Sequence, residues 1–408
     1  MSIQSLTVPA PAADFADLQV GKVAESNADP STHPSTHPST WSEVATLADV
    51  PVAAWRRLAE ASLAPNAFYL PEWARAVNAH ATGKTGARAL LVWDGPARER
   101  LIGLLPVVSA WRALRIPVPA LVAWQAYAPL TTPLLDRTVA TAAARGLLKA
   151  ARDAGAKALL VPFVEMESRV AEALRSAALA RGGEAWTIGA HERARLDAGV
   201  DPEAMFKSAL GAKKLKELRR QRHRLADAGS VTFAASSSPD NLPAALATFL
   251  RLEGGGWKGE RGTALASDPG DAAFVQEATA ALAARGQAEI VTLSHGGEPV
   301  AAGLVLRHGR RAFFFKIAYD ERLSKLSPGV QLTLDLTQRL CADPDIDDAD
   351  SIAIAGHPMI NRIWPARLPV GDLLMPTGHG AGIILPVFAA SIAARECARR
   401  TVHRFRHR

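Results

Sequence analysis

Apolar positions in the second half of the chain follow a period of two and then a period close to four. Residues 299–307 (PVAAGLVLR) and 310–319 (RRAFFFKIAY) are apolar and aromatic runs separated by a His-Gly pair, which predicts two strands joined by a tight turn. Residues 330–340 (VQLTLDLTQRL) carry leucine at every fourth position, which predicts a helix with one apolar face. The stretch therefore predicts a strand that stops shortly before a helix begins.

The residues at this helix start suit an anion. Pro328 fits a first helical turn because its missing N–H would have no partner there. Gly329 lets a ligand approach the backbone closely. Free N–H groups at a helix start bind anions, so this helix start is an anion site in principle, best suited to a phosphate or pyrophosphate. The alternative is an ordinary helix start, since so short a motif is weak by itself.

Similar patterns predict the remaining elements and the order of domains. Strands are expected at 87–93, 100–109, 156–164, 194–197 (as an edge strand), 287–295 and 350–355, and helices at 52–61, 71–80, 139–152, 168–181, 202–228, 242–253 and 271–285. Helices, a strand pair, a helix and a buried strand occur in that order twice, which indicates a duplicated module. The fold class is therefore α/β (α+β), with two domains of mixed sheet flanked by helices.

Domain limits follow from composition. The polar repeat before Trp41 predicts a disordered tail over 1–40. An N-terminal domain is expected over 41–190, a C-terminal domain over 191–376, and a helix with a basic tail over 377–408. At 408 residues, 48% hydrophobic and 21% charged, the chain is long enough for two cores.

Charge and cysteine content narrow the functional classes. The net charge of +7 and the pI near 9.6 favour anionic ligands or surfaces. Cys341 and Cys397 have no metal-binding or redox spacing, so no metal site is expected. No signal sequence is recognisable and no apolar run is predicted to span a bilayer, which favours a cytoplasmic protein. The segment 383–408 is predicted either to pack on the body or to contact the membrane peripherally.

Several pieces together resemble a known family. They are the basic helix ending at Arg224, the run Leu252-Glu253 followed by Trp257-Lys258-Gly259, the strand end 315–320, and Ser327-Pro328-Gly329. Over 195–365 the chain resembles the GNAT-type acyltransferases of the CelD/BioF-like group, which are related to the Fem peptidyltransferases. The resemblance implies two tandem GNAT-like folds, with the donor diphosphate at Ser327, Gly329 and Val330.

The resemblance also implies a reaction. An acyl group would pass from an acyl-CoA, with acetyl-CoA the expected donor, to an amine or hydroxyl of a cell-envelope or exopolysaccharide precursor, which would be a small-molecule or lipid-linked saccharide. One departure concerns residues 356–362 (GHPMINR). Many relatives carry an acidic pair and Pro-Tyr-Lys there, so the tyrosine that would protonate a leaving thiolate is missing.

Acyl transfer needs a base for the acceptor and a partner for the leaving sulfur. His357 and Glu253 are the candidate bases, although a turn histidine or a helix-end carboxylate is often structural. Tyr319 and Asp320 are expected where the strand splays toward the thioester. Lys316 lies in an apolar strand and is expected to reach the donor, because an unpaired buried ammonium is costly.

The acceptor is expected near Trp257, Lys258, Asn361 and Arg362. The helix 213–224 carries seven Lys or Arg residues and is either a solvated surface or a site for CoA phosphates, a polyprenyl-phosphate sugar or tRNA. Sequence-specific nucleic-acid binding is not expected, because no aromatic readout motif accompanies these charges. Two alternatives stay open, a Fem-like transferase that uses aminoacyl-tRNA as donor and a non-catalytic scaffold for polysaccharide assembly.

Overall fold

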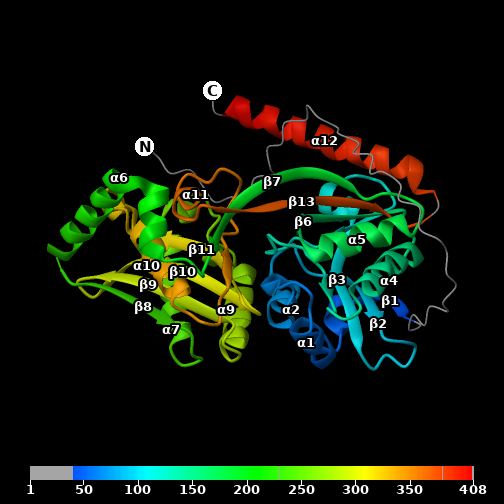
Figure 1. Ribbon diagram of the computed structural model, residues 1–408, viewed down its shortest axis with the longest axis horizontal. Helices are drawn as coiled ribbons and strands as arrows, with labels where there is room; N and C mark the ends of the chain where they lie inside the picture. Colours follow the sequence, from blue (N-terminus) through cyan, green and yellow to red (C-terminus); the bar gives the residue numbers. More distant parts are fainter. Residues whose placement is uncertain (1–39, 228, 379, 407–408) are drawn as a thin grey trace.

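The computed structural model describes residues 40–227, 229–378 and 380–406, with side chains described up to Ala398 (Figure 1). The predicted polar tail lies outside the described residues except for Thr40. Nearly all described strands join one mixed sheet in the order β1-β2-β3-β4-β6-β13-β7-β12-β11-β10-β9-β8, and β5 pairs with β3. Helices cover both faces of this sheet, and the predicted α/β class is confirmed.

The first half contains β1 (Trp41–Thr46), β2 (Arg88–Trp93), β3 (Leu101–Ser109), β4 (Ala120–Ala123), β5 (Leu134–Leu135) and β6 (Ala158–Glu165). Its helices are α1 (Val52–Glu60), α2 (Pro71–His80), α3 (Ala110–Leu114), α4 (Ala140–Asp153) and α5 (Arg169–Leu179), with 3-10 turns η1 (Leu47–Asp49) and η2 (Ala67–Tyr69).

The second half contains β8 (Val231–Ser236), β9 (Ala288–His295), β10 (Glu298–His308), β11 (Arg311–Tyr319) and β12 (Asp348–Asp350). Its helices are α6 (Pro202–Asp227), α7 (Leu242–Gly254), α8 (Trp257–Glu260), α9 (Pro269–Ala283), α10 (Pro328–Cys341) and α11 (Ile360–Ile363), with η3 (Leu265–Ser267) and η4 (Glu321–Leu326). Gly211 interrupts α6 with a φ of 75°, where the chain bends.

Two long strands, β7 (Trp186–Asp197) and β13 (Ala366–Pro376), join the halves. In each half four antiparallel neighbours lead to a parallel pair, β4 with β6 and β11 with β12. The strand that follows β6 in sequence, β7, pairs with β12 of the second half, whereas β13 pairs with β6 of the first. The two modules have therefore exchanged their last strands, and both long strands cross the molecule side by side (Figure 1).

Most predicted elements are confirmed within a few residues, two differ, and some strands, β1, β4 and β8 among them, were not predicted. The predicted edge strand at 194–197 is wrong, because it is the end of the twelve-residue β7 at the centre of the sheet. The strand predicted at 350–355 ends at Asp350. β13 was not predicted, since Pro369 and Gly371 are residues that seldom occupy a central strand.

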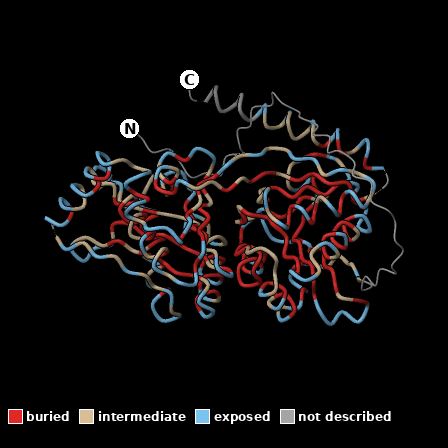
Figure 2. The backbone as a smooth tube through the Cα atoms, in the orientation of Figure 1, coloured by how far each residue is buried: buried red, intermediate tan, exposed pale blue. Residues whose placement is uncertain are grey.

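Alternate residues of the second-half strands build two cores. Leu304 and Phe313 pack under α7 and α9 in a core that continues into the first half. Val305 and Phe314 pack on the other face under α6, α10 and α11. Figure 2 shows buried residues following the strands in both halves. The first core is thus shared between the halves, which makes the molecule one packed unit.

The C-terminal helix α12 (Ala381–Arg406) lies along β13 and β6 (Figure 1). Leu385 and Phe388 are buried against the sheet, while Ile383 is 78% exposed and Val387 47% exposed. Ala381–Ala398 has a mean hydropathy of 1.5 and is long enough, by length and composition alone, to cross a membrane. The uninterrupted apolar run still ends at Ala394, and the helix reaches this length because it continues past Arg395 and Glu396.

Candidate active site

β11 and β12 pair over only three positions and then separate. Arg311 to Phe313 lie opposite Asp348 to Asp350, after which β11 continues to Tyr319 without β12 beside it. The segment that follows β12 stays beside β7, where the Ser351 N–H donates to the Ala194 carbonyl. Ile352 then takes a φ of 55°, a conformation that a β-branched residue rarely adopts. The two central strands therefore splay apart, as the sequence predicts.

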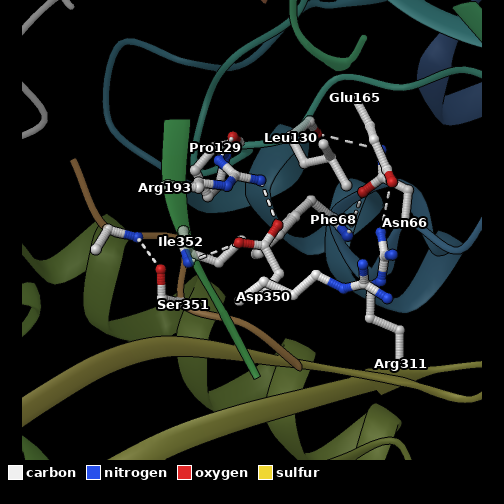
Figure 3. Close-up of polar contacts among 12 residues, drawn as sticks. Asn66, Phe68, Pro129, Leu130, Glu165, Arg193, Arg311, Asp350, Ser351 and Ile352 are labelled. Atoms are coloured by element: carbon white, nitrogen blue, oxygen red, sulfur yellow. Dashed lines mark hydrogen bonds and ion pairs between the residues drawn. The ribbon is translucent and has the colours of Figure 1, made fainter. Parts of the chain in front are cut away.

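A buried ion pair fixes the point of separation (Figure 3). Arg193 of β7 pairs with Asp350, the last residue of β12, and also donates to the Pro129 carbonyl at 2.9 Å. The second carboxylate oxygen of Asp350 accepts from the Ile352 N–H at 2.9 Å. Arg311 contacts both Asp348 and Glu165 of β6, and these charges raise its guanidinium pKa although burial alone would lower it. The charges of β7 and β11 thus anchor the opening to the first half.

The start of α10 closes one end of the opening. Ser327 has a φ of 53°, its N–H donates to the Ser324 carbonyl, and the Val330 N–H donates to the Ser327 carbonyl, both at 3.0 Å. The prediction of three unpaired amides is therefore corrected. Gly329 is the position of the three whose N–H has no partner among the described residues. A Cβ at Gly329 would lie 3.1 Å from Tyr319 Cδ1, so the backbone and this ring approach closely.

Three predicted residues meet in a buried charge cluster. The Oε1 atom of Glu253 lies 3.0 Å from Lys316 Nζ and 3.2 Å from Lys258 Nζ, while Oε2 accepts from the Leu265 N–H at 2.9 Å. Burial alone would raise the pKa of Glu253, but Lys316, Lys258 and the amide together lower it. Burial and the nearby Lys316 charge lower the pKa of Lys258. A carboxylate stabilised by three donors is a weak base, so this geometry favours a structural role for Glu253.

The cluster borders the splayed part of β11. Lys258 Nζ lies 3.4 Å from the Ile317 carbonyl, and Lys316 directly follows Phe315, the residue skipped where the register between β10 and β11 shifts. Trp257 carries Lys258 and Arg261 near its ring face, with centroid distances of 5.8 and 5.3 Å. The predicted donor contact at Lys316 and acceptor contacts at Trp257 and Lys258 therefore share one neighbourhood.

The remaining predicted residues cap local structure. The carboxylate of Asp320 accepts from the Arg322 N–H and pairs with its guanidinium, which lowers the Asp320 pKa. Nδ1 of His357 accepts from the Met359 and Ile360 N–H groups at 3.3 and 3.4 Å, so the ring caps α11. Burial lowers the pKa of His357. These contacts favour the structural alternative for both residues.

Asn361 and Arg362 lie on α11. Arg362 is exposed, and the buried Oδ1 of Asn361 has no partner among the described residues. The α11 helix packs beside α6 and belongs to the core under α10, whereas Glu253 lies on the opposite face of the sheet. The structure therefore separates the predicted acceptor residues into two groups.

A tyrosine and an aspartate that sequence reasoning missed lie near the charge cluster. Tyr127 OH donates to Asp271 Oδ2, and Asp271 Oδ1 is buried without a partner among the described residues. Burial, Asp271 and Glu253 raise the pKa of Tyr127. The ring centroids of Tyr127 and Phe274 lie 4.4 Å apart. Tyr127 has a positive φ of 48°, which no pattern in the sequence predicts.

Aromatic rings connect this pair to the opening. Phe274 contacts Trp73 at 5.5 Å, and Trp73 contacts Phe315 of β11 at 5.0 Å. Trp73 also donates its Nε1 hydrogen to the Tyr127 carbonyl. Side chains of both halves thus line up from α9 to β11.

The equivalent position in the first half is filled by the chain itself. β4 and β6 also pair over three positions, Ala120 to Val122 with Ala158 to Leu160. Beyond them Thr131 donates to the Pro162 carbonyl, and Phe163 N donates to Asp372 Oδ1 of β13. These contacts bridge the gap in the first half, whereas the gap in the second half borders Tyr319 and the start of α10. No group of three or more potential metal ligands occurs in the described parts of the chain.

Comparison with known proteins agrees with this geometry. Residues 212–352, which include the splay and the start of α10, match the acetyltransferase (GNAT) domain family. The chain contains a GNAT acetyltransferase domain of the CelD/BioF-like family. No curated protein sequence matches the chain.

Solved structures show the same fold. One is the C-terminal domain of a candidate lysylphosphatidylglycerol synthetase from Agrobacterium fabrum, with a TM-score of 0.51 and 14% identity over 84% of this chain and 95% of that one. Another is FemX, with a TM-score of 0.50 and 10% identity over 80% of this chain and 96% of that one. At such identity the likeness concerns the fold alone. The GNAT domain therefore sits in a molecule with two GNAT-like halves.

Proposed function

We propose that this GNAT transferase moves an acyl group from an acyl-CoA, with acetyl-CoA the expected donor, to an amine or hydroxyl of a cell-envelope or exopolysaccharide precursor. The observation that carries the proposal is the splay of β11 and β12 beside the start of α10, inside the segment that matches the GNAT family. The splay offers unpaired strand edge to the pantetheine arm, and the Gly329 N–H faces a diphosphate.

The residues around the opening supply the chemistry of the transfer. The acceptor nitrogen or oxygen attacks the thioester carbonyl, the carbon–sulfur bond breaks, and the departing thiolate takes a proton. Tyr319 lies against Gly329, where the donor would enter, and burial and Glu321 raise its pKa, so it stays protonated at neutral pH. Tyr127 and Asp271 are the pair placed to hold the acceptor, because Asp271 has a buried oxygen without a partner.

Calorimetric titration with acetyl-CoA tests the donor site. The Gly329→Val variant should lose binding, because its side chain would meet Tyr319 and cover the free amide. Gly329→Ala should bind about tenfold more weakly, since only one methyl is added. Gly382→Val, where a Cβ meets no atom within 4 Å, is the matched control. Unchanged affinity in a cooperatively folding Gly329→Val protein would refute the assignment.

The alternative donor is an aminoacyl-tRNA. It is favoured by the exposed basic side chains of α6, where Lys213, Lys216, Arg220 and Arg224 have no partner among the described residues. Phosphate contacts by such side chains would make tRNA binding fall steeply with salt. Tight, salt-sensitive binding of charged tRNA without any acetyl-CoA binding would select this alternative. Absence of transfer from either donor would select the scaffold.

A cytoplasmic location at the inner face of the membrane completes the proposal. The outward face of α12 is apolar at Ile383 and Val387, and its sequence continues into an arginine-rich tail. Such a helix would lie in the interface of an anionic bilayer. Co-sedimentation with phosphatidylglycerol vesicles should fall severalfold in the Ile383→Glu/Val387→Glu variant. Equal sedimentation of both proteins would remove the membrane from the proposal.

A further inference from the structure

A pocket of about 290 Å³ opens between the two halves, at the end of β11 opposite the splay. Its walls come from α1 and the start of α2 in the first half, and from the α9–β9 link and the β10–β11 turn in the second. The turn lies at the first residue of β11 and Tyr319 at the ninth, so about 26 Å of strand separates the two sites at roughly 3.3 Å per residue. The pocket is therefore distinct from the proposed donor site.

Guanidinium groups surround the mouth of the pocket. Arg137 donates to the Ala61 and Glu60 carbonyls at 3.1 and 2.6 Å, which orients its side chain without neutralising its charge. Arg56 contacts Glu72 at 2.6 Å through Nε, which leaves its two terminal nitrogens without a partner among the described residues. Arg285 reaches Glu60 at 3.1 Å. Arg310 also lines the pocket but is paired with Asp347, so the other three cations against two carboxylates leave one net positive charge, which favours an anion.

Two buried side-chain oxygen atoms of the residues that line the pocket accept no hydrogen bond from the described residues. The Glu72 side chain is 3% exposed, and its Oε2 atom has no partner among the described residues, while Oε1 takes both arginines. Gln287 Oε1, in the wall that comes from the second half, is also buried without a partner among the described residues. A buried acceptor without a donor is unfavourable, so a ligand hydroxyl would be stabilised here.

The floor of the pocket is rigid. The buried ring of His308 accepts the Asn66 N–H at Nδ1, so its Nε2 carries the hydrogen and donates to the Ala59 carbonyl at 2.9 Å. Burial lowers its pKa, and both ring nitrogens are occupied. His308 therefore joins the halves and leaves recognition to the arginines and Glu72.

We propose that this pocket binds a small hydroxylated anion of the sugar-phosphate class. Its phosphate would lie on the free guanidinium nitrogens of Arg56, Arg137 and Arg285, and a hydroxyl would donate to Glu72 Oε2. The volume is close to the lower limit of about 300 Å³ for small-molecule pockets, which suits a single hexose phosphate. Because both halves contribute walls, the ligand would bind only the assembled molecule and stabilise it.

Calorimetry with glucose 1-phosphate, glucose 6-phosphate, inorganic phosphate and glucose tests the proposal on the full chain. A hexose phosphate should bind at least tenfold more tightly than inorganic phosphate, and glucose should not bind measurably. Arg285→Gln should weaken both phosphates at least tenfold. Glu72→Gln should weaken the hexose phosphate at least tenfold and leave inorganic phosphate unchanged or tighter, because a negative charge is removed. Arg152→Gln, whose partner is the exposed Asp153, is the control.

Each outcome decides the matter. Binding of inorganic phosphate alone, no binding of either hexose phosphate, or hexose phosphate binding to Glu72→Gln as tight as to the wild type would overturn the proposal. Ordered water would then be the partner of Glu72. If Glu72→Gln does not fold, Gln287→Leu tests the hydroxyl contact without changing any charge. Acetyl-CoA affinity should stay unchanged in every pocket variant, which separates this site from the donor site.

Discussion

Replacing Glu253 by glutamine is the sharpest test of how the site is held together. The side chain of Glu253 is fully buried and faces two ammonium groups at 3.0 and 3.2 Å. Glutamine keeps the volume and can still accept the Leu265 N–H, but it removes the carboxylate that contacts both lysines. Two like charges would then remain buried side by side, in a neighbourhood that already lowers the pKa of Lys258.

The expected loss can be worked from the distances. At an effective dielectric constant of about 20, unit charges 3.0 Å apart attract by about 5 kcal/mol, and most of this offsets the desolvation of the three groups. Removing one partner leaves the other charges uncompensated, which costs about 3–5 kcal/mol in comparable buried pairs. We expect Glu253→Gln to lose that much of its free energy of unfolding. Asp153→Asn, which breaks the exposed Lys149–Asp153 pair, should lose less than about 1 kcal/mol.

The pH dependence gives a second signature. Without Glu253 the pKa of Lys258 falls further below its ordinary value of 10.5. Between the lowered pKa and 10.5 the unfolded chain binds more protons than the folded one, so stability rises with pH in that window. The deficit of Glu253→Gln should therefore shrink from pH 7 to pH 9.

Urea unfolding followed by circular dichroism at both pH values measures these quantities. A deficit below about 1 kcal/mol would show that the three side chains are not energetically coupled. A deficit of the expected size that does not change with pH would show that neither lysine gives up its proton. Unchanged acetyl-CoA turnover in the folded variant would also confirm that Glu253 is not the base.

Three further predictions follow. His357→Ala should lose about 1 kcal/mol of its free energy of unfolding with unchanged turnover, because the ring caps α11, and His357→Asn should restore the stability. A fall in turnover for both variants would instead indicate a catalytic role. Burial raises the pKa of Asp372 to about 7, so the wild type should lose stability as pH rises from about 4 to 7. In thermal melts, Asp372→Asn should be a few kcal/mol more stable than the wild type at pH 8 and equally stable at pH 4. A chain cut after residue 200 should yield fragments that aggregate separately and recover a folded complex only when co-expressed, as light scattering would show; a soluble monomeric fragment would contradict the strand exchange.

Local patterns were sufficient to predict most helices and the antiparallel strands β2, β3, β9, β10 and β11. The apolar face of α10 and the aromatic run of β11 follow periods that depend only on neighbours in sequence. The splay itself was expected only from the family resemblance, because η4 separates the end of β11 from Ser327-Pro328-Gly329 and β12 follows α10 in sequence. What the sequence could not show is that the Ser327 and Val330 amides already have backbone acceptors.

The central strands escaped prediction because their partners are distant in sequence. In β7, Arg193 and Arg195 are typical of an exposed edge, yet Asp350 and Asp348 neutralise them from about 150 positions further along the chain. Tyr127 and Asp271 meet for the same reason, since one lies in a loop of the first half and the other on α9. Long-range charge pairing of this kind leaves no periodic signal.

The exchange of β7 and β13 explains why one half can keep an open site. A splayed parallel pair exposes backbone groups, which is unfavourable unless a ligand or another segment covers them. In the first half the segment around Thr131 covers the gap, and β13 fixes it through the contact of Asp372 with Phe163. In the second half Arg193 of β7 holds Asp350 and keeps the gap apart. The strand that each module contributes to the other therefore holds the gap there: β13 contacts the first-half gap through Asp372, and β7 contacts the second-half gap through Arg193.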